Sequence, residues 1–159
     1  MAKTKTPSKP AQLNLKIRIP HVILDLRGAD PKVAEALAGG LEELGARFHV
    51  LGSGLKSVPH VFSLEEALEV GHMWVVFGDQ LPSEFAMIIE RGIVPLMRTG
   101  LHSKADNYNP IEESGNAFLF DKESHWQIYS ALVRALENFN FSYDWENIRA
   151  QGRCLLERA

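Results

Sequence analysis

The segment GIVPLMRTGL, residues 92–101, is followed after a polar stretch by NPIEESGNAFLF, residues 109–120. Each contains an apolar run of strand length, residues 93–97 in the first and 117–120 in the second. Continuous apolar runs are typical of strands that are buried on both faces of a parallel sheet. The first run leads directly into the polar turn Arg98-Thr99-Gly100. Because open α/β sheets bind ligands at the carboxyl ends of their strands, this turn predicts a binding position.

The rest of the chain alternates apolar runs with segments of helical spacing. Asp30-Pro31 is a typical helix start, because Asp caps the amino end and Pro fits the first turn. Ser63 and Glu66 have the spacing of a capping box, and Asp121 is the expected cap of a later, long helix. We therefore expect strands at residues 19–26, 47–51, 73–77, 93–97 and 117–120, a short extra strand at 58–62, and helices at 31–44, 63–71, 82–92, from 121 and from about 144.

Strands that alternate with helices indicate a parallel sheet that is covered on both faces. The expected fold class is α/β, a single Rossmann-like three-layer sandwich with a mainly parallel sheet of five or six strands. Residues 101–116 form a long loop without a clear pattern. Loops of this length in a compact domain are usually functional or mobile.

The composition is that of an ordinary globular domain with a basic start. The chain has 159 residues, of which 45% are hydrophobic and 23% are charged, and its net charge is −3. This length suffices for a single core. The first 18 residues hold five Lys or Arg and no acid. We expect residues 1–16 to be a disordered basic tail and residues 17–159 to be the folded domain.

Several classes of partner are not expected. The remainder of the chain is acidic and would repel a phosphate backbone, so we expect no nucleic-acid partner. No apolar stretch reaches the ~18 residues of a membrane span, and no signal-peptide core follows the basic start, so we expect no membrane partner and a cytoplasmic location. Cys154 is the one cysteine, and no pair of the six histidines has the spacing of metal ligands. We predict no metal site and no cofactor.

Three turns at predicted strand ends carry groups that suit a diphosphate. Arginine can bind phosphate bidentately, hydroxyls donate hydrogen bonds, and glycine lets backbone N–H groups approach the anion. Since parallel strands end at one edge of the sheet, we expect these turns to meet there. The plainer alternative stays open, namely that the glycines only turn the chain and the arginines face water. The expected nucleotide- and phosphate-binding residues are Arg27, Gly28, Gly52, Arg98, Thr99 and Gly100.

Two further residues are candidate ligand contacts. Asp79 follows the strand at residues 73–77, where a carboxylate could reach a ligand, although a solvated loop acid explains it as well. His102 follows the Arg98 turn directly. A dinucleotide site is not expected, because Gly52-Ser53-Gly54 lacks the third glycine of the fingerprint and no helix begins there. No catalytic residue is assigned.

The remaining histidine and aromatic candidates have structural explanations. His21 and His49 lie within predicted strands, where a structural role is the simplest one. Trp126 and Tyr129 share a helix face and Trp145 begins the last helix, so core packing explains them better than stacking on a sugar.

The order of these pieces resembles the C-terminal, nucleotide-sugar-binding half of a GT-B glycosyltransferase of the starch and glycogen synthase type. Each motif is weak alone, and the order and spacing carry the resemblance across residues 22–153. The matching segments are RGAD (27–30), VLGSG (50–54), EVGHMWVVF (69–77), PLMRTGL (95–101), SGNAFLF (114–120) and WENIRAQG (145–152).

The resemblance implies a retaining hexosyl transferase that uses ADP-glucose or UDP-glucose to extend an α-glucan. Arg27 would stand where the family has its phosphate-binding Lys, and the turn Arg98-Thr99-Gly100 would hold the phosphates. The chain also departs from the family pattern. The acid expected near Leu81 is missing, the turn at Gly100 has lost a glycine, and the acceptor-binding half is absent.

Three hypotheses follow from these matches to the family pattern and departures from it. The first is a nucleotide-sugar-binding domain of the glycosyltransferase type, inactive alone, which works with an acceptor-domain protein partner or is a fragment of a longer enzyme. The second is a non-catalytic binding or interaction module on the same Rossmann-like scaffold, which the missing acid favours. The third is an unrelated Rossmann-like domain that binds another nucleotide or a protein.

Overall fold

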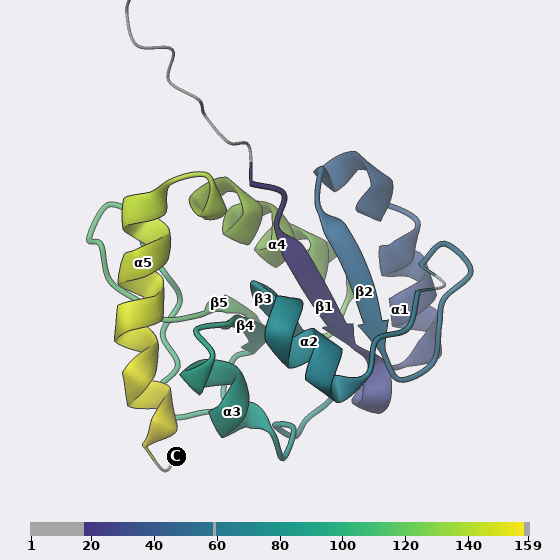
Figure 1. Ribbon diagram of the computed structural model, residues 1–159, viewed down its shortest axis with the longest axis horizontal. Helices are drawn as coiled ribbons and strands as arrows, with labels where there is room; N and C mark the ends of the chain where they lie inside the picture. The colour runs from purple at the N-terminus through teal and green to yellow at the C-terminus, as the bar shows by residue number, and fades with distance from the viewer. Residues whose placement is uncertain (1–17, 59, 158–159) are drawn as a thin grey trace, which may run out of the picture.

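Five parallel strands form one sheet in the order β2-β1-β3-β4-β5 in the computed structural model, which describes residues 18–58 and 60–157 (Figure 1). The predicted α/β fold with a mainly parallel sheet of five or six strands is confirmed, and the sheet has five strands. The predicted basic tail, residues 1–16, lies outside the described residues. The strands are β1 (His21–Asp25), β2 (Arg47–Leu51), β3 (Met73–Val76), β4 (Val94–Arg98) and β5 (Phe118–Phe120).

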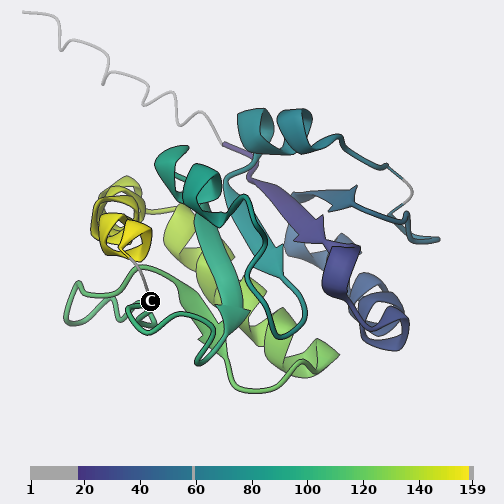
Figure 2. The ribbon, with the colours of Figure 1, turned by 90° about the horizontal axis from the view of Figure 1, so that it is seen from below.

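Helices cover both faces of the sheet (Figures 1 and 2). Successive residues of a strand point to opposite faces, so β1 sends Val22 and Leu24 into the core with α1 and α4 and sends Ile23 into the core with α2 and α3. All three side chains are fully buried. The helices are α1 (Pro31–Ala38), α2 (Leu64–Val70), α3 (Phe85–Glu90), α4 (His125–Phe139) and α5 (Ser142–Gln151).

The last helix, α5, and the 3-10 turn that follows it together contribute to both cores. Its Trp145 is 2% exposed and packs in the core with α4. Leu155, in the 3-10 turn Gly152–Leu156 that follows, is 2% exposed and packs in the other core with α3. Figure 1 shows α5 standing at the β5 end of the sheet. The end of the described chain therefore joins the two layers of helices.

The helix starts show which caps were correctly predicted. Asp30 accepts the N–H of Lys32 in front of α1, and Ser63 forms the predicted capping box with Glu66 in front of α2. The first helix is shorter than expected, since it stops at Ala38 and a 3-10 turn, Leu41–Leu44, follows the two glycines.

The predicted cap of α4 is wrong. The cap is Ser124, whose side chain accepts the N–H of Gln127, and not Asp121. The side chain of Gln127 reaches back to accept the backbone N–H groups of residues 121 and 122. These bonds hold the segment before Ser124 in a turn, and helix geometry begins three residues later than the sequence indicates.

The long loop, residues 101–116, is tied down along its second half. Isolated bridges pair Asn107 with Ala117 and Asn109 with Ser114. Side chains of α5 hold the loop from outside, because the N–H of Gly115 donates to Oε1 of Gln151 at 2.8 Å. The predicted extra strand at residues 58–62 is reduced to one bridge, between Val50 and Val61.

The aromatic side chains divide between core and surface. Tyr129 packs against the core, as expected. The core-packing expectation for Trp126 is wrong, because this side chain is 73% exposed in the first turn of α4. None of the described helices has both the length and the apolar composition needed to cross a membrane.

Candidate functional site

The three predicted turns emerge at one edge of the sheet. All five strands run in the same direction, and β1, β2 and β4 therefore end at the edge that Figure 2 shows from below. β2 is the direct neighbour of β1, while β3 separates β1 from β4. Two strand spacings amount to about 10 Å. The turns are thus close enough to form one rim, which we call the carboxyl rim.

Arg27 at this rim is bonded to two acids. Its Nε and Nη2 donate to the carboxylate of Asp25, each at 2.9 Å, and its Nη1 and Nη2 donate to that of Glu84 at 3.1 and 3.0 Å. Asp25 is 5% exposed and also accepts the indole N–H of Trp74 at 3.1 Å. Four of the five guanidinium N–H groups are thereby used.

This network shifts the pKa of Arg27 and of Glu84. Hydrogen bonding to Asp25, and then to Glu84, raises the pKa of Arg27. The bond from Arg27 is the chief reason why the pKa of Glu84 lies below its ordinary value. A hollow of about 240 Å³ lies beside these three side chains. The cation that the resemblance assigns to phosphate is therefore already neutralised by protein carboxylates.

The rim glycines allow strand-end turns to pack on one another. A Cβ at Gly78 would lie 3.0 Å from the carbonyl oxygen of Gly28, and Gly78 has a φ of +88°. A Cβ at Gly52, where φ is +109°, would lie 3.4 Å from the backbone nitrogen of Arg27. The N–H of Gly78 donates to Glu123 at 2.6 Å. Backbone packing accounts for Gly28 and Gly52 without a ligand.

The β4 turn is the open part of the rim. Thr99 donates its N–H to the carbonyl of Phe120 at 2.9 Å and its hydroxyl to Asp121 at 3.0 Å. Gly100 has a φ of +92°, and a Cβ there would meet nothing within 4 Å. Arg98 is half-buried, and no described residue hydrogen-bonds or ion-pairs with its guanidinium.

The two weaker candidates lie in different surroundings. Asp79 is exposed in the turn that follows β3. His102 is only 5% exposed, its Nδ1 accepts the N–H of Lys104 at 3.1 Å, and its ring lies 5.9 Å from that of Phe85. The structure brings Asp79 to the carboxyl rim and keeps His102 inside the core.

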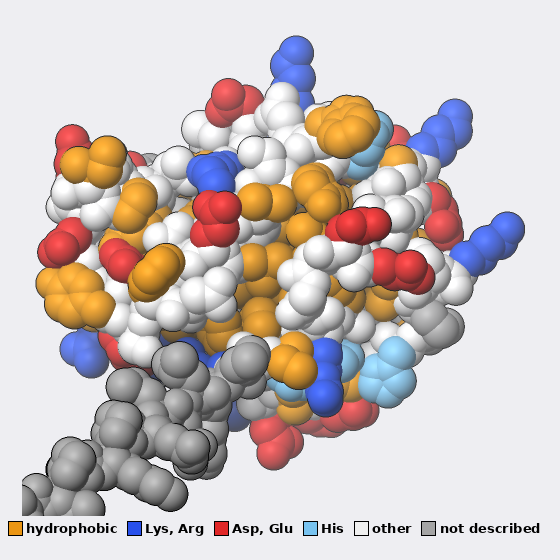
Figure 3. All heavy atoms as spheres, turned by 90° about the horizontal axis from the view of Figure 1, so that it is seen from above, with side chains coloured by type: hydrophobic (Ala, Val, Ile, Leu, Met, Phe, Trp, Pro, Cys, Tyr) orange, Lys and Arg blue, Asp and Glu red, His pale blue; other side chains and the backbone are white. Residues whose placement is uncertain are grey.

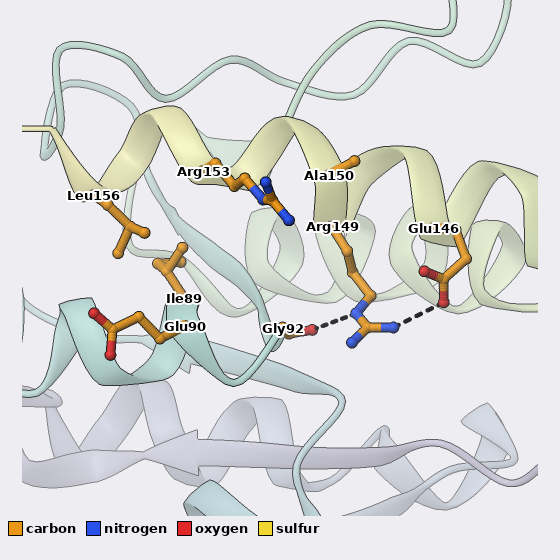
Figure 4. A pocket seen from close by; sticks show the side chains of 8 residues that line it. All are labelled: Ile89, Glu90, Gly92, Glu146, Arg149, Ala150, Arg153 and Leu156. Atoms are coloured by element: carbon orange, nitrogen blue, oxygen red, sulfur yellow. Dashed lines mark hydrogen bonds and ion pairs between the residues drawn. The ribbon is translucent and has the colours of Figure 1, made fainter.

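A further hollow of about 440 Å³ separates α3 from α5 (Figure 4). Arg149 crosses it, with Nε donating to the carbonyl of Gly92 at 3.0 Å and Nη1 donating to Glu146 at 2.7 Å. Gly92 precedes β4 and thus lies at the amino end of the sheet. Arg149 fastens α5 to the turn before β4, far along the strand from the carboxyl rim.

The sequence did not predict that four histidines gather at the amino end of the strands. Nδ1 of His21 lies 2.8 Å from Nε2 of His49, and Nδ1 of His49 lies 3.4 Å from Nδ1 of His60. His72 accepts the N–H of His21 at 2.9 Å. Figure 3, seen from above, shows histidines at one side of this end of the molecule and hydrophobic side chains in its middle.

Three members of the histidine cluster, His21, His49 and His72, have a lowered pKa. Burial, followed by the charges of neighbouring His21 and His60, lowers the pKa of His49 to about 4. Burial also lowers the pKa of His21 and of His72. Across residues 18–58 and 60–157, no group of three or more His, Cys, Asp or Glu side chains has a geometry that could hold a metal ion.

Sequence reasoning missed Asp25 and Glu84 as partners of Arg27. Asp25 was placed inside a strand, and Glu84 is explained equally well by its position at the start of α3. The available signal was an acid at the end of an apolar run, two residues before Arg27. No local pattern could have indicated Glu84, which is 57 residues away from Arg27 in the chain.

Comparison with known proteins gives relatives for part of the chain. No protein-family model matches it. A stretch of 65 residues, 40% of the chain and 14% of the relative, is 34% identical to "Glycogen synthase 1" of Synechocystis sp.. A stretch of 63 residues, 38% of the chain and 14% of the relative, is 36% identical to "Glycogen synthase" of Gloeobacter violaceus.

A solved structure extends the likeness to the fold. The catalytic domain of starch synthase IV from Arabidopsis thaliana, bound to ADP and acarbose, superposes with a TM-score of 0.61 at 18% identity. The match covers 92% of this chain and 36% of that one. The chain is thus similar to part of glycogen and starch synthases, and the predicted resemblance is confirmed. It spans only a small part of the length of the glycogen synthases that it matches.

Proposed function

We propose that this chain is a nucleotide-sugar-binding domain of the glycosyltransferase type, which holds ADP-glucose or UDP-glucose at the carboxyl rim and is inactive alone. The observation that carries the proposal is the open β4 turn, where Arg98 has no protein partner among the described residues and the backbone at Gly100 is accessible. A guanidinium and a hydroxyl at a strand end can neutralise and position a diphosphate. The ADP in the starch synthase structure supports this ligand class.

The proposal gives the two rim arginines unequal roles. Arg98 would bind the phosphates directly. Arg27 could bind them bidentately only if the phosphate replaced Glu84, because Asp25 and Glu84 already occupy four of its five N–H groups. Glucosyl transfer would require an acceptor-binding domain from another chain or from a longer protein, because the chain covers 36% of the starch synthase structure.

Calorimetric titration with ADP, UDP, ADP-glucose and UDP-glucose tests the binding. We expect Arg98→Ala to weaken binding roughly 10- to 100-fold, because a bidentate charge-assisted contact is lost. Arg153→Ala in the 3-10 turn after α5 is the matched control, since it removes an exposed arginine away from the rim. Equal affinity of Arg98→Ala and the unaltered chain would show that the phosphate assignment is wrong.

The second candidate function is a non-catalytic interaction module. The ion pairs of Arg27 with Asp25 and Glu84 favour it, together with the missing acid near Leu81. Transfer of labelled glucose from ADP-glucose to maltoheptaose by the isolated chain would contradict this alternative. Nucleotide binding without transfer would agree with a domain that is inactive alone, and absence of binding would favour the interaction module. The cytoplasmic location stays a prediction.

A further inference from the structure

Two members of the histidine cluster meet at the distance that a tetrahedral zinc ion imposes on its ligands. Nδ1 of His49 lies 3.4 Å from Nδ1 of His60, which is long for a hydrogen bond. Zinc binds histidine nitrogen at about 2.0–2.1 Å, so two nitrogens of one zinc tetrahedron lie about 3.3–3.4 Å apart. The two nitrogens therefore already have the spacing of a ligand pair.

The backbone around β2 fixes the positions of these two residues. His49 lies on β2, and His60 follows eleven residues later. The N–H of Val50 donates to the carbonyl of His60 at 3.1 Å, and the N–H of Phe62 donates to the carbonyl of Val50 at 2.8 Å. The sequence did not predict the pair, because these long-range backbone bonds bring the rings together and no local spacing indicates them.

The phenyl ring of Phe62 holds both imidazoles. It stacks on His49 with ring centres 4.0 Å apart and planes 9° apart, and it meets His60 edge-on with ring centres 4.9 Å apart. Phe62 itself is only 9% exposed. Because the two side chains are ordered in advance, a bound ion has little conformational entropy left to remove.

His21 supplies the outer contact that a histidine ligand needs. Nε2 of His49 lies 2.8 Å from Nδ1 of His21. Metal-bound histidines almost always donate their second ring N–H to an acceptor, which fixes the tautomer. In the tautomer in which Nε2–H donates to His21, Nδ1 of His49 presents its lone pair toward His60. Burial is the chief reason why the pKa of His49 is about 4, so the ring is neutral at pH 7, as a metal ligand must be.

The charges beside the pair oppose one another. Arg47 lowers the pKa of His49 and Glu66 raises it, so both lie near the ring. Oε1 of Glu66 accepts the N–H and the hydroxyl of Ser63, and its Oε2 bonds to no described residue. The positive charge of Arg47, which would repel a cation, is thus offset by a carboxylate on the neighbouring helix.

We propose that His49 and His60 form a two-histidine site for zinc, in which water completes the coordination. Imidazole nitrogen is among the preferred ligands of zinc, and the exposed ring of His60 gives the ion access. The site has two protein ligands, and so it differs from the clusters of three or more that the described residues do not contain. Bound zinc would fasten the segment after Gly52 to β2 and stabilise the folded state.

Calorimetric titration of the full chain with zinc chloride tests the site. We expect one saturable site, and we expect His49→Asn and His60→Asn each to weaken it at least tenfold, since loss of an outer contact alone costs about that much. His60 is exposed, so His60→Asn should fold even if His49→Asn does not. The matched controls are His125→Asn and Cys154→Ser, which change other potential zinc ligands and should bind as the unaltered chain does.

NMR of the imidazole nitrogens identifies the ligands directly. Zinc should shift the ring ¹⁵N resonances of His49 and His60 and leave those of His125 in place. His21→Phe keeps a ring beside His49 but removes the acceptor of Nε2–H, and it should weaken zinc binding roughly tenfold. Thermal unfolding should show a zinc-dependent rise in the unaltered chain and none in His60→Asn.

Three outcomes would overturn the zinc site. They are no saturable binding of zinc, binding that His49→Asn and His60→Asn both leave unchanged, and binding that is lost in His125→Asn or Cys154→Ser. The site goes beyond the nucleotide-binding proposal, because it concerns a different ligand and different residues. Arg98→Ala should weaken ADP binding and leave zinc binding intact, and His60→Asn should do the reverse, so either proposal can fail without the other.

Discussion

At the scale of single residues, the carboxyl rim shows that a cation near a predicted site is available to a ligand only if protein acids leave it unpaired. Arg27 and Arg98 both stand at strand ends, but only Arg27 is held by carboxylates, those of Asp25 and Glu84. The side chain of Arg27 is 39% exposed, so its ion pairs contribute little to stability. Their main consequence is that they leave Arg27 less available to bind a ligand than Arg98.

Replacing Glu84 should reveal whether Arg27 takes part in nucleotide binding. Glu84→Gln removes one of the two charges that neutralise Arg27. We expect ADP to bind roughly three- to tenfold more tightly, because one fewer carboxylate neutralises the guanidinium and competes with the phosphate for it. Calorimetry measures the change, and Glu90→Gln in the same helix is the control. Unchanged affinity in Glu84→Gln would remove Arg27 from the site.

The glycines of the rim allow a second test, which separates backbone strain from collision. Gly78 and Gly100 both have a positive φ, but only the Cβ of Gly78 would approach another backbone atom, at 3.0 Å. We expect Gly100→Ala to lower the free energy of unfolding by ~1 kcal/mol and Gly78→Ala by ~3 kcal/mol. Urea unfolding measures both values. Equal losses would mean that the turns of β1 and β3 do not pack as described.

At the scale of elements, strands were predicted better than helix ends. Apolar runs identified all five strands to within two residues at every end, because burial on both faces leaves a local pattern. The start of α4 was misplaced because Asp121 and Ser124 are both good caps, and the side chain of Gln127 decides between them. The contacts of the candidate site could not be predicted, since Arg27 meets Glu84 only after the sheet has formed.

The histidine cluster joins several elements and predicts acid sensitivity. His49 on β2 faces His21 on β1 and His60, with Arg47 and Glu66 nearby. Its folded pKa, about 4, lies below the unfolded value. The unfolded chain therefore binds more protons, and stability should be constant above pH ~6.5 and should fall from there toward pH ~4.

Urea midpoints at pH 7.5, 6 and 5 measure this effect. His49→Asn should flatten the decline between pH 6.5 and 4, because it removes the most strongly shifted member of the cluster. His125→Asn at the start of α4 leaves the cluster intact and should decline as the unaltered chain does. A midpoint that is the same at pH 7.5 and 5 would contradict the prediction.

At the scale of the whole molecule, the chain resembles one portion of a larger protein and yet its described residues form two hydrophobic cores.

A ligand that binds only the folded state should stabilise the whole domain against unfolding. At an ADP concentration 100 times the dissociation constant, binding adds about 2.7 kcal/mol, which for a domain of this size raises the melting temperature by roughly 5–10 °C. Thermal unfolding with and without ADP measures the shift. Arg98→Ala should abolish most of it, and a shift that persists in this variant would place the nucleotide elsewhere.

The position of α5 has a consequence for how the protein is made. One layer needs Trp145 and the other needs Leu155, so the two layers of helices are both complete only when residue 155 has emerged from the ribosome. Until then the nascent chain exposes apolar surface on both sides of the sheet, which is the condition under which chaperones bind. Completion of both cores is therefore expected only after residue 155 has emerged from the ribosome.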